Sequence, residues 1–152
     1  MCTRRQTCVR AASLIAAFVT PVQGQELTIP FDFAADRGSL LVRARVDNRP
    51  VLLIVDTGSS HTILRPSAVG MSAAELAAPR SGAGVIGDAV GREVTLEVGA
   101  REWRRRKVSV MDLSQILSAY RERIDGLLGL DFLLEFSQAV IHLKKRVVTF
   151  IP

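Results

Sequence analysis

The segment that most restricts the fold is VLLIVDTGSS, residues 51–60, in which an aliphatic run ends on an acid. Residues 51–55 do not alternate between apolar and polar side chains, which predicts a strand buried on both faces. Asp56 follows directly, and Gly58 permits a tight turn and the close approach of another backbone. The sequence therefore predicts a carboxylate held rigidly where a buried strand ends, a geometry suited to general acid–base chemistry. The alternative is a structural aspartate that only caps the turn.

The first 24 residues are typical of an export signal. Arg4, Arg5 and Arg10 precede the short apolar stretch 11–20, and small residues follow before a cut near Gly24. The apolar stretch is too short for an ordinary membrane span, although an uncleaved N-terminal membrane anchor is the alternative. We therefore expect a signal peptide over 1–24 and one domain over 25–152, exported to the periplasm or secreted, with no stable membrane span after cleavage.

Removal of this segment changes the chemistry that is available. Both cysteines, Cys2 and Cys8, lie in it, so the mature chain would have neither a disulfide nor a cysteine nucleophile. Three of the 20 Lys and Arg residues also go, leaving 17 against 15 acidic residues and a formal charge of +2 instead of +5. The basic balance therefore says little about nucleic acid, and we expect no nucleic-acid partner.

Short β-prone segments follow one another closely along the mature chain. Two stretches look helical, 65–79 and 113–120, and the first of these carries a capping-box spacing at Ser72 and Glu75. The segments expected to be strands are 26–33, 39–50, 51–56, 62–64, 92–99, 101–113, 139–143 and 147–151. This pattern predicts a mostly-β barrel or sandwich.

Three stretches in order carry a resemblance to a known family. VDTGSSHTIL (55–64) is similar to the active-site turn of aspartic proteases, and DGLLGLDFL (125–133) resembles the hydrophobic-hydrophobic-Gly element that this family places beside that turn. A closing hairpin, AVIHLKKRVVTF (139–150), comes last. The chain most resembles the single-domain, retropepsin-like bacterial members. The resemblance implies a closed retropepsin-like β-barrel with one half-site per chain.

The resemblance also implies roles for individual residues. Asp56 would be the catalytic acid, Thr57 would tie two active-site turns together, Gly58 would allow the turn, and Ser59 would hydrogen-bond the carboxylate. A substrate-binding flap tip would be formed by Gly84, Val85, Ile86 and Gly87. Leu127, Leu128 and Gly129 would pack behind the catalytic turn as structural support.

A second catalytic aspartate is missing from the sequence. No other Asp-Thr-Gly or Asp-Ser-Gly occurs, so the second carboxylate would be Asp56 of another copy in a two-fold homodimer. Asp125 is the competitor within the chain, although Asp-Gly before a strand is ordinary turn chemistry. This arrangement implies an aspartic endopeptidase that acts on peptide or protein substrates and needs no metal or other cofactor. The alternative is a catalytically inactive module of the same fold that binds peptides or a partner in the cell envelope.

Several other motifs have simpler interpretations. Gly82, Gly84 and Gly87 form G-x-G-x-x-G, but strand-like sequence follows where a nucleotide-binding motif needs a helix. RRRK (104–107) is expected to form a solvated strand edge. His61 follows Ser60 directly, and neighbours along a strand point to opposite faces, so no Ser–His pair is expected.

Three further residues are expected to have ordinary structural roles. Trp103 and Tyr120 are expected to be packing residues. Asp131 is expected to cap a short helix after Leu130.

Overall fold

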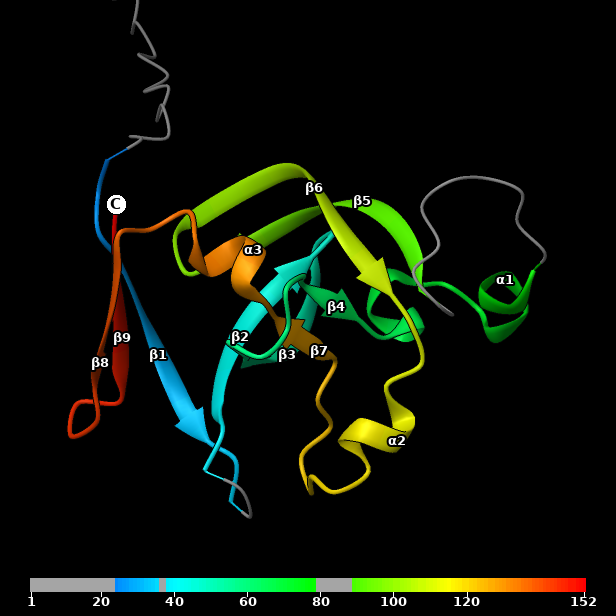
Figure 1. Ribbon diagram of the computed structural model, residues 1–152, viewed down its shortest axis with the longest axis horizontal. Helices are drawn as coiled ribbons and strands as arrows, with labels where there is room; N and C mark the ends of the chain where they lie inside the picture. The colour runs from blue at the N-terminus through cyan, green and yellow to red at the C-terminus, as the bar shows by residue number, and fades with distance from the viewer. Residues whose placement is uncertain (1–23, 36–37, 79–88) are drawn as a thin grey trace, which may run out of the picture.

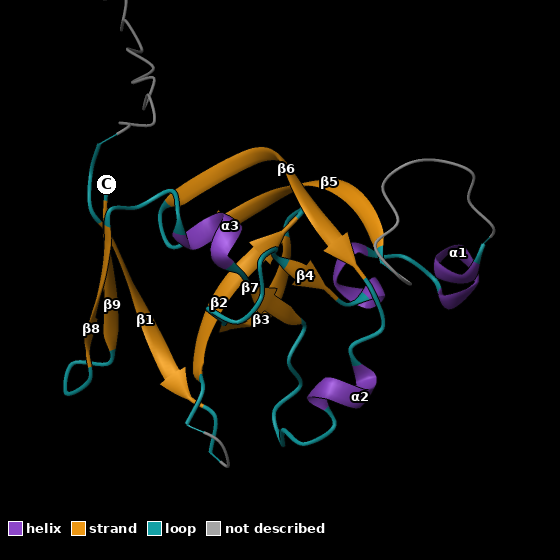
Figure 2. Cartoon of the chain, viewed as in Figure 1, coloured by secondary structure: helices purple, strands orange, loops and turns teal. Residues whose placement is uncertain are grey.

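The computed structural model describes residues 24–35, 38–78 and 89–152. Within them the chain is mostly β-structure, with short helices at the periphery (Figures 1 and 2). The strands are β1 (Leu27–Phe33), β2 (Leu40–Val46), β3 (Arg49–Val55), β4 (Ile63–Leu64), β5 (Val90–Val98), β6 (Arg101–Val110), β7 (Gly126–Leu128), β8 (Gln138–His142) and β9 (Val147–Ile151). The helices are the 3-10 turn η1 (Pro66–Val69), α1 (Ala73–Ala77), α2 (Ser114–Leu117) and α3 (Leu130–Leu133).

Six of these strands close into a barrel. Their order is β3-β7-β4-β6-β5-β2, and β2 also pairs with β3, which joins the two ends of the ring. Closure of a sheet removes its exposed edges. The predicted closed β-barrel is confirmed.

Strand β3 explains why residues 51–55 show no alternation. Leu53 lies in the larger of two hydrophobic clusters, and Ile54 lies in the smaller one. Successive side chains of a strand point to opposite faces, so a strand between two clusters is apolar on both. The predicted two-faced burial is confirmed.

A three-stranded extension continues the sheet outside the barrel. β1 pairs with β2 through residues 31–33 and with β9 through residues 27–30, and β8 pairs antiparallel with β9. β1, β9 and β8 lie side by side at the left of Figure 1, opposite α1. The predicted closing hairpin is therefore present, and β8 forms its outer edge.

The helical predictions were partly right. The stretch 65–79 contains two short elements, η1 and α1, separated at Gly70, whose φ of 67° favours glycine. The capping box between Ser72 and Glu75 is present at the start of α1. The second predicted helix is the four-residue α2.

Candidate active site

Asp56 is the first residue after β3, where the chain leaves the barrel. The residue is half-buried, and its Oδ1 accepts a hydrogen bond of 2.8 Å from the backbone N–H of Gly58. Thr57 and Gly58 are exposed, and the Thr57 hydroxyl bonds to no other described residue. The turn therefore presents one pinned carboxylate oxygen and one unused hydroxyl at the surface.

The backbone of the turn is fixed from behind by β7 and α3. β7 runs parallel to β3, and the N–H of Asp56 donates to the carbonyl of Leu128 at 3.0 Å. The N–H of Leu130 donates to Ser59 O at 2.8 Å. Leu127 and Leu128 are both buried beneath the turn. The structure thus brings the sequence-predicted support residues against the Asp56 turn.

Gly129 allows this close approach. A Cβ added at this position would lie 2.4 Å from the carbonyl carbon and oxygen of His61 and 3.0 Å from Ser59 O. Real Cβ atoms do not approach backbone so closely, so any side chain here would separate α3 from the turn. The hydrophobic-hydrophobic-Gly element is therefore needed for contact between two backbone segments.

Thr62 is a functional candidate that the sequence analysis did not single out. Its side chain is completely buried, and its hydroxyl donates to Asp131 Oδ1 at 2.8 Å. The same hydroxyl accepts a bond of 3.4 Å from the N–H of Gly129. A single buried hydroxyl therefore joins the end of the Asp56 turn to the start of α3.

Asp131 does not cap α3, contrary to the prediction. The N-cap of that helix is Gly129, and the Asp131 carboxylate instead accepts from Thr62 and faces Arg106 on β6, 3.5 Å away. Asp131 is the second residue of α3, and its side chain is directed toward β6 and not back to the helix end.

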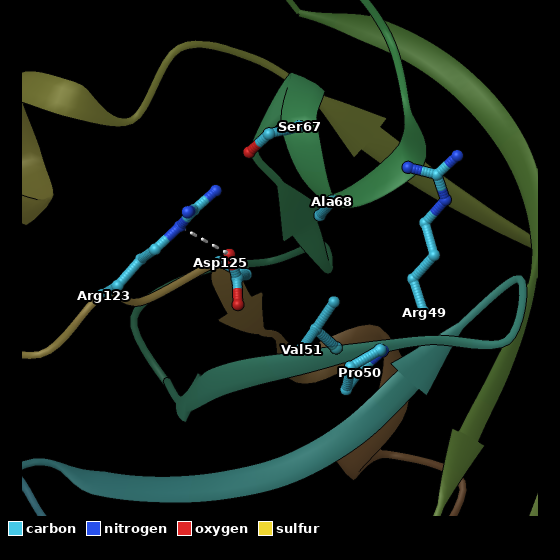
Figure 3. A pocket seen from close by; sticks show the side chains of 7 residues that line it. All are labelled: Arg49, Pro50, Val51, Ser67, Ala68, Arg123 and Asp125. Atoms are coloured by element: carbon cyan, nitrogen blue, oxygen red, sulfur yellow. Dashed lines mark ion pairs between the residues drawn. The ribbon is translucent and has the colours of Figure 1, made fainter.

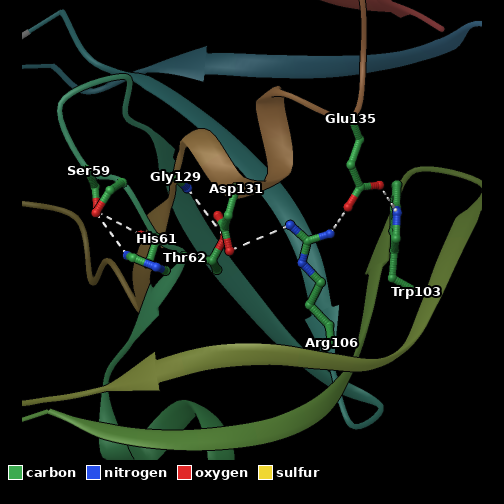
Figure 4. Close-up of polar contacts among 9 residues, drawn as sticks. Ser59, His61, Thr62, Trp103, Arg106, Gly129, Asp131 and Glu135 are labelled. Carbon is green, nitrogen blue, oxygen red and sulfur yellow. Dashed lines mark hydrogen bonds and ion pairs between the residues drawn. The ribbon is translucent and has the colours of Figure 1, made fainter. Parts of the chain in front are cut away.

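Arg106 is half-buried and ion-paired, although RRRK was expected to be solvated (Figure 4). Its side chain is only 11% exposed and forms ion pairs with Asp131 and Glu135. Trp103 Nε1 donates to Glu135 at 2.6 Å, so this residue does more than pack. The prediction holds for Arg104 and Arg105, which are exposed, and was wrong for Arg106. The Asp56 turn, α3 and β6 are thereby connected by a continuous polar network.

Two expectations for the turn itself differ from the structure. The Ser59 hydroxyl donates to His61 O at 2.7 Å and not to the Asp56 carboxylate. Ser60 Oγ and His61 Nδ1 lie 2.8 Å apart, so these neighbours do meet. The reason is that residues 60 and 61 form a bend, where the alternation of a strand does not apply. Both residues are exposed, and no carboxylate in the described part of the chain orients the imidazole.

Asp125 is not positioned to pair with Asp56. The parallel register places Gly126 beside Leu53, so Asp125 lies at the level of Leu52, four residues before Asp56 along β3. At about 3.3 Å per residue this is a separation of roughly 13 Å. Asp125 Oδ2 accepts a hydrogen bond of 3.0 Å from the N–H of Leu52, so this side chain bonds to the backbone of β3 within the barrel.

A hollow of about 420 Å³ lies at the far end of β3 (Figure 3). Arg49, Arg123 and Asp125 border it, and Arg123 and Asp125 form an ion pair of 3.8 Å. Because these residues are at the start of β3 or level with it, the hollow is separate from the Asp56 turn.

Some predictions lie beyond what the structure describes. The flap tip, Gly84 to Gly87, the G-x-G-x-x-G motif and nearly all of the expected signal peptide fall outside the described residues. Within the described residues, no helix is both long enough and apolar enough to cross a bilayer. No group of three or more His, Cys, Asp or Glu in those residues could hold a metal ion.

Comparison with solved structures shows the class of the fold. The fold is similar to the crystal structure of a retropepsin-like aspartic protease from Rickettsia conorii, with a TM-score of 0.53 at 20% identity. That match covers 84% of this chain and 91% of the other. The retroviral protease-like domain of Ddi1 from Leishmania major matches with a TM-score of 0.48 at 18% identity, covering 74% of this chain and 87% of that one. No curated protein matches the chain significantly.

The family assignment comes from the sequence. A family model described as aspartyl protease matches residues 42–132, which include the Asp56 turn, β7 and most of α3. The chain therefore belongs to the aspartyl protease family, and its fold is retropepsin-like.

Proposed function

We propose that the protein is an aspartic endopeptidase in which Asp56 of two subunits forms one catalytic site. The observation that carries the proposal is the turn at Asp56, a half-buried residue whose carboxylate accepts from the Gly58 N–H, in a chain with a single Asp-Thr-Gly. Two candidates for a second acid within the described chain have other partners. Asp125 accepts a hydrogen bond from β3, and Asp131 accepts from Thr62 and pairs with Arg106. The missing carboxylate would therefore come from a second copy.

In this proposal the two Asp56 carboxylates share one proton and hold one water. The ionised carboxylate takes a proton from the water, and the water oxygen attacks the peptide carbonyl carbon. The protonated one hydrogen-bonds the carbonyl oxygen, and the C–N bond then breaks as the amine is protonated. Because one carboxylate must be ionised and the other protonated, activity should be bell-shaped in pH and greatest on the acid side. The exposed Thr57 hydroxyl would hydrogen-bond across the two turns.

We also propose that the protein acts outside the cytoplasm. The support is the basic and apolar order of residues 4–20 and the small residues near Gly24. N-terminal sequencing of the protein recovered from the periplasm or the medium tests this. A chain recovered intact from the membrane would indicate an N-terminal anchor instead.

The test of the catalytic proposal is cleavage of a mixed peptide library from acid to neutral pH. Asp56→Asn should lower the rate by about 10² to 10⁴, the usual contribution of general acid–base catalysis. Asp125→Asn is the matched control, since its amide oxygen can still accept from Leu52, and it should cleave at the wild-type rate. If the Asp56 variant cleaved as fast as the wild type, the proposal would be wrong. A folded dimer that cleaves nothing at any pH would favour an inactive peptide-binding module.

A further inference from the structure

The hollow at the start of β3 has both apolar and charged lining (Figure 3). Its volume of about 420 Å³ lies within the range of about 300–1,000 Å³ that is usual for small-molecule sites. Val51 and Ala68, which line it, are buried and belong to the larger hydrophobic cluster. The hollow therefore offers an apolar surface of suitable size for a small organic molecule.

One cation at this hollow is held in place but has no polar partner. Arg49 lies two residues before Val51 on β3, so both side chains point to the same face of the strand. A Cβ added at Gly70 would lie 2.8 Å from Arg49 Nη2 and 3.0 Å from its Cζ, so the guanidinium packs directly against this glycine. No hydrogen bond or ion pair joins that guanidinium to another described residue. Its N–H donors are therefore positioned and unused.

A second cation lies across the hollow from the first. Figure 3 shows Arg49 and Arg123 on opposite sides, with Ser67 of η1 between them. Arg123 Nε lies 3.8 Å from Asp125 Oδ1, which is longer than a hydrogen bond, and the Arg123 side chain is 78% exposed. Asp125 Oδ2 already accepts from the N–H of Leu52. Arg123 therefore keeps N–H donors that a ligand can use.

Ser67 adds a third donor, and the charges around the hollow favour an anion. Ser67 is exposed, and its hydroxyl bonds to no other described residue. Two arginines among the lining residues outnumber the one acid, Asp125. Guanidinium groups bind phosphate and carboxylate oxygens through paired N–H donors. Donors on three separate residues suit a phosphate group, which has three terminal oxygens, better than a carboxylate with two.

We propose that this hollow binds a small organic phosphate monoester. Its phosphate oxygens accept from Arg49, Arg123 and Ser67, and its organic part lies against Val51 and Ala68. The inference goes beyond the proposed function and does not depend on it. The hollow shares no side chain with the Asp56 turn and lies at the opposite end of β3.

The first part of the test is an NMR titration of the protein with phenyl phosphate at neutral pH. Backbone amides at 49–51, 67–68 and 123–125 should shift in a saturable way, while those of the Asp56 turn stay in place. Benzyl alcohol, a neutral molecule with the same ring, should not produce these shifts. No saturable shift at millimolar phenyl phosphate, or equal shifts with benzyl alcohol, would overturn the proposal.

Two further probes test the class of ligand. Inorganic phosphate lacks the ring that would lie on Val51 and Ala68, and benzoate has the ring but only two anionic oxygens. Each should bind more weakly than phenyl phosphate, by about tenfold. Benzoate that binds as tightly would reject a phosphate site, and inorganic phosphate that binds as tightly would reject the organic part.

The second part uses arginine variants. Arg49→Gln and Arg123→Gln should each weaken phenyl phosphate binding by about tenfold, because each removes one charge-assisted contact. Both residues are exposed, so the fold should be retained. Arg104→Gln is the matched control, since Arg104 is also an exposed arginine beside one carboxylate, that of Glu102. A loss at Arg104 as large as at the other two would indicate only a general effect of charge.

The third part moves Arg49 without removing its charge. Gly70→Ala places a Cβ where the guanidinium now lies, so it should weaken phenyl phosphate binding. Gly38→Ala is the control, because Gly38 has a φ of 66°, close to the 67° of Gly70, and a Cβ there meets nothing within 4 Å. Both variants carry the same backbone strain, and only the first displaces Arg49. Wild-type affinity in Gly70→Ala would contradict the assigned role of Arg49.

Discussion

The Asp56 turn and strand β8 differ in how many contacts they make within one subunit. The turn is held by backbone hydrogen bonds from β7 and α3 and by the buried Thr62 hydroxyl, which is linked through Asp131 to the half-buried Arg106. β8 has one strand neighbour and no buried side chain. The difference shows that one chain builds the support for the Asp56 turn, whereas β8 is held on one side only.

This comparison predicts that substitutions behind the turn are costly and that matched substitutions at exposed positions are not. The largest effect should come from Gly129→Ala, because its Cβ would lie 2.4 Å from the His61 carbonyl. We expect a loss of about 3 kcal/mol or more in the free energy of unfolding, since backbone must move to make room. Gly91→Ala in β5 is the control, where a Cβ meets nothing within 4 Å, and should change stability by about 0.5 kcal/mol or less. Urea unfolding of both variants gives the comparison, and equal losses would contradict it.

Arg106→Met should have the next largest effect. The substitution leaves Asp131 and Glu135 without their half-buried cation, and removal of one partner from a fully buried pair costs about 3–5 kcal/mol. Both carboxylates are partly exposed, so we expect about 2 kcal/mol. Arg43→Met is the control, because Arg43 is 80% exposed beside Asp32 and should contribute at most about 1 kcal/mol. Thermal and urea unfolding should agree, and a neutral Arg106→Met would show that the network is dispensable.

Thr62→Val should cost less, because it removes one hydroxyl and keeps the shape of the side chain. Asp131 Oδ1 would lose its donor and the Gly129 N–H its acceptor, which predicts a loss of about 1–2 kcal/mol. Thr28→Val is the control, since the Thr28–Thr149 hydroxyl pair on the β1–β9 extension is exposed. Chemical unfolding of the two variants tests this, and a larger loss at Thr28 would reverse the comparison.

The smallest effect concerns α1, a helix with no buried residue. The pKa of Glu75 is lowered chiefly by its hydrogen bond to the Ser72 backbone N–H, then by the Ser72 hydroxyl. A lowered folded-state pKa means that this contribution is present above the ordinary glutamate pKa and is lost as pH falls through the folded value. In Ser72→Ala the Glu75 pKa should move back toward its ordinary value as observed by NMR titration, while the core is unaffected. An unchanged Glu75 pKa in the variant would show that the capping box does not form in solution.

The closing hairpin and the Asp56 turn could be predicted from local patterns. Those patterns left a barrel and a sandwich as alternatives, and the closed barrel was predicted through the family resemblance. Residues 51–55 indicated two-sided burial, and Gly129 was placed behind the turn through the family resemblance. These features depend on backbone geometry, which short sequence motifs can predict.

The polar network could not be predicted because it depends on which face of β6 is buried. In the run RRRK the sequence does not distinguish Arg106 from Arg104 and Arg105. A register shift opposite Val94 and Leu96, with Arg105 at a φ of 53°, inserts an extra residue and sets Arg106 toward α3. Thr62 likewise becomes a linking residue only when α3 packs against the turn.

The measurement that tests the central claim most directly is a subunit-mixing titration. Wild-type chain is mixed with Asp56→Asn chain at constant total concentration and allowed to exchange before peptide cleavage is measured. If both Asp56 carboxylates are needed, activity follows the square of the wild-type fraction, so an equal mixture retains about a quarter of the wild-type rate. An equal mixture that retains about half of the rate would mean that each chain works alone, and would contradict the shared site.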